Sequence, residues 1–419
     1  MTPDTDPIAR YERFRQADPD NPNLIQALGD LYHRAGRFDQ ALACFADGLR
    51  VEPGNAALRG RLAMVWISQH RFAEAEQQLQ ELVADSPGDP ALWHNLGLAQ
   101  FHQKKFDAAR DSLATAEGKG ARAPETYSHL AHAWHHLGDV QRAREAAQRW
   151  AQVSPSAAAE GYLSLVELDC GDYDAAFARA DATLAKDPDN VDANVVSGVN
   201  ALEQQQIERA ESQYATASRL EPDNPRAWVG VALVRLHHRE HARAIEAFER
   251  ALALSPRNVG TIIALGWAQL SIREHVAAEK TFRRAILVDR TFGEAYGGLA
   301  SALVMQNRRD EARREIERAR RLNAGGFGAV YAQSVLLALE GRQPLGERLM
   351  TKALQRSVRP GTPSLYEYSR TFLRQLPAPT GPEAGPGPAA TGPATGPASG
   401  PATTGPDPEP VDSGPPPSA

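Results

Sequence analysis

A fixed spacing of 34 residues constrains the fold of this chain more than any other feature of its sequence. The boundary prolines and the alanines downstream of them divide most of the chain into ten repeats, and every step is 34 residues except one of 33. The repeats begin at Pro22, Ala56, Pro90, Pro124, Ala157, Val191, Pro225, Val259, Gly293 and Phe327. A sustained period of this length indicates supersecondary units that stack on their neighbours.

Small residues recur at two positions of the repeat. Position 20 is occupied by Ala41, Ala75, Ala109, Ala143, Ala176, Ala210, Ala244, Ala278, Ala312 and Gly346. Position 8 is Gly, Ala or Ser throughout, from Gly29 to Ser334, and position 24 often carries a large apolar residue such as Phe45. Two antiparallel helices approach to about 8–10 Å only where the side chains at their crossing are small. We therefore expect each repeat to be a helical hairpin that crosses at positions 8 and 20.

The repeat pattern resembles a known family. Its order is aromatic-x2-Leu-Gly/Ala-x2-aromatic, then Ala, then Phe or Leu, then Pro, and this is similar to the tetratricopeptide repeat. The resemblance implies an all-α fold, a right-handed α-α superhelix (a solenoid) of about ten helix pairs. The repeat from Ala157 departs most, with Glu160 and Glu167 at packing positions, and the repeat from Phe327 carries Gln333 where Leu is expected.

The sequence predicts four segments. Residues 1–21 form an N-terminal capping half-repeat, with Tyr11 and Phe14 at the packing positions of a second helix. Residues 22–360 form the repeat array, with nine clear repeats and one degenerate one, and residues 361–379 form a C-terminal capping helix. Residues 380–419 contain 12 Pro and 8 Gly, so we expect a disordered tail.

Composition and motifs exclude several classes of protein. The formal net charge of −6 argues against binding to nucleic acid through bulk charge. No basic and apolar leader is visible, no stretch approaches about 18 apolar residues, and Cys44 and Cys170 are too few for a disulfide framework. We therefore expect a cytoplasmic protein with no transmembrane segment. No phosphate loop, nucleophile elbow or zinc-protease motif is present, so we expect neither an enzyme nor a cofactor.

The family resemblance implies that the first helix of each repeat lines a concave groove. Its groove positions in this sequence carry the candidate partner-binding residues His94, Asn95, His102, His129, His132, His136, Val195, Val199, Leu202, Leu233, Leu236, Ile263, Trp267 and Leu270. The early part of this set is rich in histidine and the later part is apolar. No residue of the set is expected to be catalytic or to bind a cofactor.

Two members of this set leave alternatives open. The histidines at 129, 132 and 136 share one helix face, which could be a plain polar lining, could charge and hold acidic groups, or could bind a metal. Trp267 lies at a groove position with Gly297 and Gly298 near it in the next repeat. It is either a contact for a partner or a packing residue.

The sequence thus favours a non-catalytic scaffold or adaptor that binds a peptide or helix of a partner protein in the groove. The alternative is a regulatory or substrate-selecting subunit of an enzyme complex, for glycosyl transfer, secretion or assembly. Nucleic acid is an improbable partner on charge grounds. The sequence predicts no oligomeric state.

Overall fold

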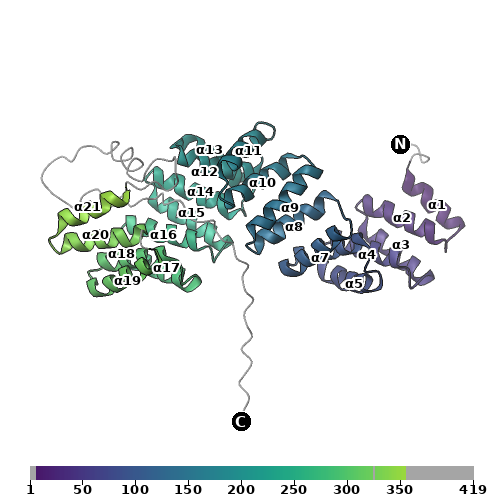
Figure 1. The fold of residues 1–419 in the computed structure, drawn as a ribbon. Coiled ribbons are helices and arrows are strands. Elements are labelled where there is room, and N and C mark those ends of the chain that lie inside the picture. The colour runs from purple at the N-terminus through teal and green to yellow at the C-terminus, as the bar shows by residue number, and fades with distance from the viewer. Residues whose placement is uncertain (1–5, 324–325, 355–419) are drawn as a thin grey trace, which may run out of the picture. The chain divides into compact units, whose positions relative to one another are not determined.

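The computed structural model describes residues 6–323 and 326–354, and within that part every regular element is a helix (Figure 1). This confirms the all-α helical-repeat fold expected from the sequence. The capping helix predicted over 361–379, the tail predicted over 380–419 and the last residues of the predicted array lie outside the described residues. None of the described helices is long and apolar enough to cross a membrane.

The helices follow the predicted period. The order is α1 (Pro7–Ala17), α2 (Pro22–Arg34), α3 (Phe38–Val51), α4 (Ala56–Ser68), α5 (Phe72–Asp85), α6 (Pro90–His102), α7 (Phe106–Gly118), α8 (Pro124–His136), α9 (Val140–Val153), α10 (Ala157–Asp169), α11 (Tyr173–Leu184), α12 (Val191–Glu203), α13 (Ile207–Leu220), α14 (Pro225–His237), α15 (His241–Leu254), α16 (Val259–Ser271), α17 (His275–Val288), α18 (Gly293–Met305), α19 (Arg309–Leu322), α20 (Phe327–Leu339) and α21 (Gln343–Leu354). Each even-numbered helix from α2 onward is the first helix of a repeat, and the next helix is its second. The hairpin of α20 and α21 forms although its repeat is the weakest in sequence.

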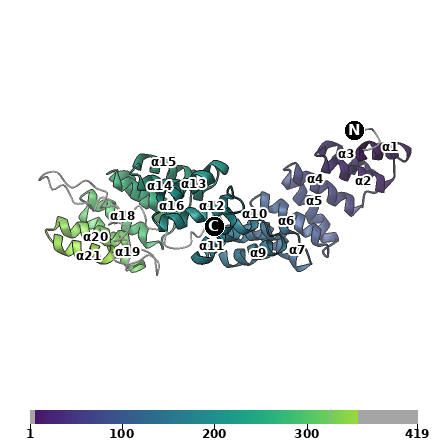
Figure 2. The same cartoon turned by 90° about the horizontal axis from the view of Figure 1, so that it is seen from above.

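The chain divides into two compact units, an N-terminal unit that ends at Ala159 and a C-terminal unit that begins at Glu160. Within each unit, helices that follow one another along the chain pack side by side. In the C-terminal unit, for example, α14 contacts both α13 and α15 (Figure 2).

Side-chain caps explain where many of the first helices begin. The last residue of the preceding repeat is Asn or Asp, and its side-chain oxygen accepts a hydrogen bond from a backbone N–H in the first turn. Asn55, for example, accepts from the backbone N–H of Leu58 at 3.0 Å. The capping residues of this kind are Asn21, Asn55, Asp89, Asn190, Asn224 and Asn258.

The turn inside each hairpin contains a left-handed residue at position 15. Its φ is positive in all ten repeats, and the residues are Gly36, His70, Lys104, Gly138, Gly171, Gln205, Arg239, Arg273, Asn307 and Gly341. The N–H of position 16 donates back to the carbonyl of position 11, as from Arg37 to Tyr32 at 2.8 Å and from Glu274 to Gln269 at 3.0 Å. This bond and the left-handed residue form the Schellman ending of a helix.

The predicted hairpin crossing is confirmed. Every alanine at position 20 is fully buried. A Cβ added to Gly97 at position 8 would lie 2.6 Å from the Leu113 side chain at position 24, so no larger residue fits there. In the last repeat the two small positions meet directly, because a Cβ added to Gly346 would lie 2.6 Å from the Ser334 carbonyl oxygen.

Helix α1 packs against the first complete hairpin. Ile8 is buried in one apolar cluster with Ile25 and Tyr32, and Tyr11 packs against the same cluster. The expectation for Phe14 is wrong, because its side chain is 48% exposed.

The unusual acids of the repeat from Ala157 form an ion-pair network in place of apolar packing. Arg179 on α11 donates to both carboxylate oxygens of Glu167, at 2.9 and 3.0 Å, and also to Glu160. The Glu167 side chain is only 5% exposed. A buried carboxylate is tolerated only when paired, so Arg179 accounts for both departures from the repeat pattern.

Candidate functional site

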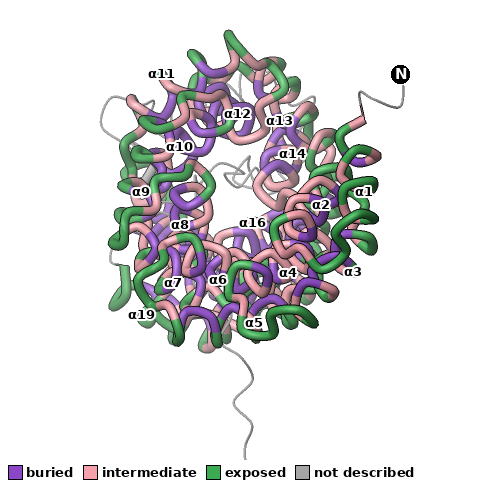
Figure 3. The backbone as a smooth tube through the Cα atoms, turned by 90° about the vertical axis from the view of Figure 1, so that its right-hand side faces the viewer, coloured by how far each residue is buried: buried purple, intermediate pink, exposed green. Residues whose placement is uncertain are grey.

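First helices of neighbouring repeats contact one another in both units and form a layer there. In the N-terminal unit the layer runs through α2, α4, α6 and α8; in the C-terminal unit α12 contacts α14, and α16, α18 and α20 contact in turn. Helix α12 is buried over much of its length, as its colouring in Figure 3 shows. We call the exposed side of each layer the first-helix surface of that unit.

The structure brings the predicted histidines of the N-terminal unit together around Phe101. The Phe101 ring centroid lies 5.1 Å from that of His129 and 6.3 Å from those of His132 and His136. His102 lies 5.8 Å from His129. These four histidines and Phe101, on α6 and α8, therefore form one cluster, which we call the histidine cluster.

Two further contacts extend the histidine cluster. The ring of His102 stacks on Phe72 at 4.7 Å, and the ring of His136 stacks on Phe106 at 4.1 Å. His94 lies on the same pair of helices, where its Nδ1 forms a hydrogen bond of 2.8 Å with the Thr126 hydroxyl. Asn95 is half-buried beside it on α6.

Burial keeps these histidines neutral. It lowers the pKa of His132 to about 4, and it also lowers the pKa of His129. Nδ1 of His129 and Nδ1 of His132 lie 2.7 Å from the carbonyl oxygens of Glu125 and Ser128. A carbonyl only accepts, so Nδ1 carries the proton in both rings, and Nε2 of each neutral ring is an acceptor.

Two of the three interpretations of the histidines are disfavoured: the binding of acidic groups by the neutral charge of the rings, and the binding of a metal by the arrangement of the side chains. A neutral cluster does not attract acidic groups at neutral pH. In the described part of the chain, no three His, Cys, Asp or Glu side chains are grouped so that they could hold a metal ion. What the surface offers is aromatic faces and acceptor nitrogens.

Three phenylalanines of this surface were missed by the sequence analysis. Phe101 lies at position 12 of its repeat, and Phe72 and Phe106 lie at position 17 of neighbouring repeats. Position 17 also carries Phe38 and Tyr173. This recurrence of aromatic residues next to the histidines was the signal that could have identified them.

The apolar candidates of the C-terminal unit differ in exposure. Val195, Leu202, Leu236 and Ile263 are buried. Val199, Leu233 and Leu270 are half-buried. Only the half-buried residues present side-chain surface outside the core.

Trp267 packs within its own unit. Its ring makes edge-on contacts with Phe282, Phe327 and Tyr331, at centroid distances of 5.6–5.7 Å. Phe327 and Tyr331 belong to α20, two repeats further along the chain. The structure therefore favours the packing interpretation of Trp267.

The expected open space beside Trp267 is absent in the described structure. A Cβ added to Gly297 would lie 2.5 Å from the backbone of Ala329, and one added to Gly298 would collide with the Phe282 ring. The two glycines therefore allow α18 to pack directly against α20 and the Phe282 ring. Near α18 and α20, the chain's own residues therefore occupy the space that a partner would need beside Trp267.

An ion pair on the first helices of the C-terminal unit was also missed. Arg226 at the start of α14 donates to both oxygens of Asp169 at the end of α10, at 2.8 and 2.7 Å. The two residues are 57 positions apart and belong to repeats that are not adjacent. No sequence pattern marked them as partners.

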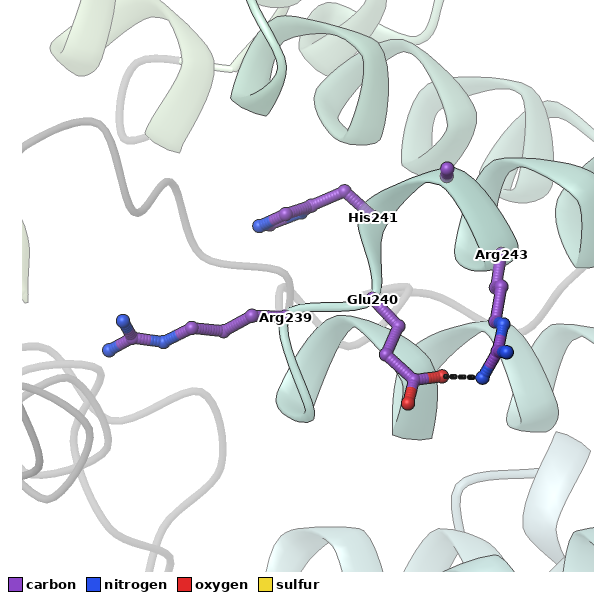
Figure 4. A pocket seen from close by; sticks show the side chains of 5 residues that line it. Arg239, Glu240, His241 and Arg243 are labelled. Atoms are coloured by element: carbon purple, nitrogen blue, oxygen red, sulfur yellow. Dashed lines mark hydrogen bonds and ion pairs between the residues drawn. The ribbon is translucent and has the colours of Figure 1, made fainter.

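A hollow at the start of α15 is not a binding cleft (Figure 4). Among the described residues, its lining comes from the single segment 239–243. Glu240 pairs with Arg235 at 2.9 Å and with Arg243 at 3.3 Å, and His241 bonds the Ser271 hydroxyl at 2.9 Å. The groups that line it are engaged in holding the turn.

Family models for the tetratricopeptide repeat match residues 36–100, 94–158 and 196–259, in phase with the hairpins described above. The chain contains tetratricopeptide repeats. A comparison with curated proteins finds no match to this tetratricopeptide repeat protein.

Solved structures similar to this tetratricopeptide repeat protein include three with low sequence identity. The human IFIT1 dimer with m7Gppp-AAAA is 14% identical, with a TM-score of 0.47, and the match covers 80% of this chain and 90% of that one. Yeast Tom70 is 16% identical, with a TM-score of 0.35 and coverage of 83% and 87%. The APC/C hetero-tetramer Cut9–Hcn1 is 14% identical, with a TM-score of 0.37 and coverage of 83% and 59%.

Proposed function

We propose that this protein is a non-catalytic scaffold or adaptor that binds a peptide or helix of a partner protein on its first-helix surfaces. Tetratricopeptide repeats generally mediate protein–protein interaction. Consecutive hairpins offer many weak contacts on one extended surface, which suits a segment of chain better than a small molecule.

The histidine cluster is the observation that carries this proposal. It is a continuous aromatic surface in which His102 and His136 are exposed and His94, His129 and His132 are half-buried. The core does not need imidazole rings at such positions, since apolar residues would pack equally well. Aromatic faces beside hydrogen-bond acceptors are typical of surfaces that hold a peptide segment.

The chemistry of the surface limits the partner. Neutral imidazoles with Nδ1 engaged accept hydrogen bonds through Nε2, and the phenylalanine faces add apolar contact. The segment that binds the N-terminal unit therefore carries apolar side chains and N–H or O–H donors. In the C-terminal unit the contact residues are the half-buried Val199, Leu233 and Leu270.

Selection from a random peptide library on the full chain tests this proposal. We expect peptides to be enriched, and His129→Ala to weaken the peptides that bind the N-terminal unit by about tenfold, as for a buried contact residue. Asp111→Asn, at an exposed position of α7, is the matched control and leaves binding unchanged. If no peptide is enriched, or the selected peptides respond to the α7 variant instead, the proposal is wrong.

A further inference from the structure

Lysine and arginine recur at two positions of the last three repeats. Positions 22 and 26 are both basic in these repeats, where they are occupied by Lys280 and Arg284 on α17, Arg314 and Arg318 on α19, and Arg348 and Lys352 on α21. In the seven earlier repeats, position 22 carries Ala43, Gln77, Asp111, Glu145, Ala178, Ser212 and Glu246. The hairpin therefore forms without a cation at this position. We call the six basic residues the basic surface.

The basic surface lies on the second helices of consecutive repeats (Figure 1). All six of its residues are exposed. Positions 22 and 26 are one turn apart on the same helix face, about 6 Å between their Cβ atoms, and like charges at this spacing destabilise a helix. Neighbouring second helices are also linked, because Arg308, just before α19, donates to Glu279 on α17 at 2.7 Å.

The basic surface is mostly without acidic partners in the part of the chain that the structure describes. Arg318 pairs with Glu315 at 2.9 Å. Arg284 donates to the carbonyl oxygen of Pro256 at 2.6 Å, which leaves its charge uncompensated. The members whose side chains form neither an ion pair nor a hydrogen bond within the described residues are Lys280, Arg314, Arg348 and Lys352.

The acids of the same region are engaged elsewhere. On α19, Asp310 pairs with Arg313 at 2.6 Å, and both oxygens of Glu311 accept from Arg308, at 2.7 and 2.8 Å. Residues 272–354 carry 15 Lys and Arg against 10 Asp and Glu, so their formal net charge is +5, whereas that of the full chain is −6. The basic surface therefore lacks negative charge that its own helices do not supply.

The complementary charge occurs later in the same chain. Residues 380–419 contain no Lys or Arg, and three of their four acids fall within the segment 407–412, with the sequence DPEPVD. Helix α21 ends at Leu354, one half-turn beyond the last cation of the basic surface. The chain that leads to 407–412 therefore leaves the described structure beside this surface. The 52 residues in between are long enough to reach any of its cations.

We propose that the basic surface of α17, α19 and α21 binds the chain's own segment 407–412 through ion pairs with Asp407, Glu409 and Asp412. The segment lies outside the described residues, and its sequence supplies the negative charge that the surface lacks. Guanidinium groups offer paired donors to carboxylates. Leu287, which is 75% exposed one turn beyond Arg284, adds an apolar contact for the one valine of the segment.

The covalent connection makes this contact stronger than its individual ion pairs. A single exposed ion pair contributes little, but several that form together within one chain benefit from a high effective concentration. The contact should weaken as salt is added, because exposed charges are screened. It uses second helices, so it goes beyond the proposed function of the first-helix surfaces and does not depend on it.

Photo-crosslinking within the full chain tests this inference. A photoreactive amino acid replaces Val411, and mass spectrometry identifies the peptides that it captures. We expect peptides of α17, α19 and α21, with capture reduced about fivefold when Arg314→Gln is combined with Arg348→Gln, and similarly in about 0.5 M NaCl. The matched control combines Arg34→Gln with Lys119→Gln, which removes two exposed cations of the N-terminal unit and should leave capture unchanged.

A variant of the segment itself completes the test without altering any described helix. Asp407→Asn, Glu409→Gln and Asp412→Asn together, with the photoreactive residue still at position 411, should abolish capture of the basic surface. Capture spread over other helices, or capture unchanged by both sets of substitutions, overturns the inference. Capture only between isotopically labelled and unlabelled copies overturns it in favour of a second copy. Binding of an added oligoglutamate peptide to the basic surface, without capture by position 411, overturns it in favour of an acidic partner.

Discussion

Position 15 of the repeat shows how one residue limits the stability of a hairpin. All ten repeats need a positive φ there, yet five of them place His, Lys, Gln or Arg in this conformation. A residue with a Cβ pays a steric cost in the left-handed region that glycine avoids. The fold evidently tolerates this cost because neighbouring hairpins hold each turn in place.

A pair of substitutions measures that cost. Arg273, with φ of 66°, should gain about 0.5–1 kcal/mol in the free energy of unfolding when changed to Gly, because the strain is relieved. Gly36 has a φ of 71° and no atom within 4 Å of an added Cβ, so Gly36→Ala should lose about 1 kcal/mol through backbone strain alone. Urea unfolding checks both, and changes of the same sign in the two variants would contradict the account.

The second prediction at the scale of a residue concerns Trp267. Trp267→Ala removes contacts with three aromatic rings and should destabilise the C-terminal unit by about 3 kcal/mol, with a smaller loss for Trp267→Phe. Thermal unfolding measures the effect. An unchanged melting temperature together with weakened peptide binding would restore the interpretation of Trp267 as a partner contact.

Ion pairs between helices explain how the repeats tolerate departures from their pattern. The side chain of Glu167 is buried and depends on Arg179. Arg179→Met leaves the Glu167 carboxylate buried without its cation, and should cost about 3 kcal/mol of stability. The triple change of Arg179, Glu160 and Glu167 to leucine should restore most of that loss, because it replaces buried charge with apolar packing. A triple variant less stable than Arg179→Met would show that the network does more than balance charge.

The histidine cluster makes the stability of the N-terminal unit depend on pH. Burial lowers the pKa of His132 from its ordinary value of 6.5 to about 4, so the folded state binds fewer protons than the unfolded state between these values. The free energy of unfolding of the N-terminal unit is therefore highest above about pH 6.5 and decreases as the pH falls towards 4. Melting temperatures across this range should therefore fall with pH, and fall less steeply for His132→Gln. A slope unchanged by this substitution would contradict the assignment.

The sequence predicts the helices and their crossings well, and the side-chain partners between repeats poorly. The 34-residue period and the small residues at positions 8 and 20 are local and repeat ten times, so each repeat supports the others. The partners of Asp169 and Trp267 lie on helices two repeats away, where no periodic signal reports contact.

At the scale of the whole molecule, the two units present first-helix surfaces of different chemistry. The N-terminal unit offers neutral histidines and phenylalanines, and the C-terminal unit offers half-buried apolar residues, with the region of α18 and α20 closed by its own packing. A partner that uses both surfaces carries apolar and donor groups in one segment and apolar side chains in another. Two linked segments bind more tightly than either alone, because the second binds at a high effective concentration.

Photo-crosslinking tests the central claim most directly. A photoreactive amino acid is placed in the full chain at Asn95 or Val199, on the first helices α6 and α12, and at exposed Asp111 or Glu208, on the second helices α7 and α13. The account predicts that the same partner is captured from cell extract through Asn95 and Val199, and not through Asp111 or Glu208. Capture of that partner through the second-helix positions, with none through the first-helix positions, would contradict it.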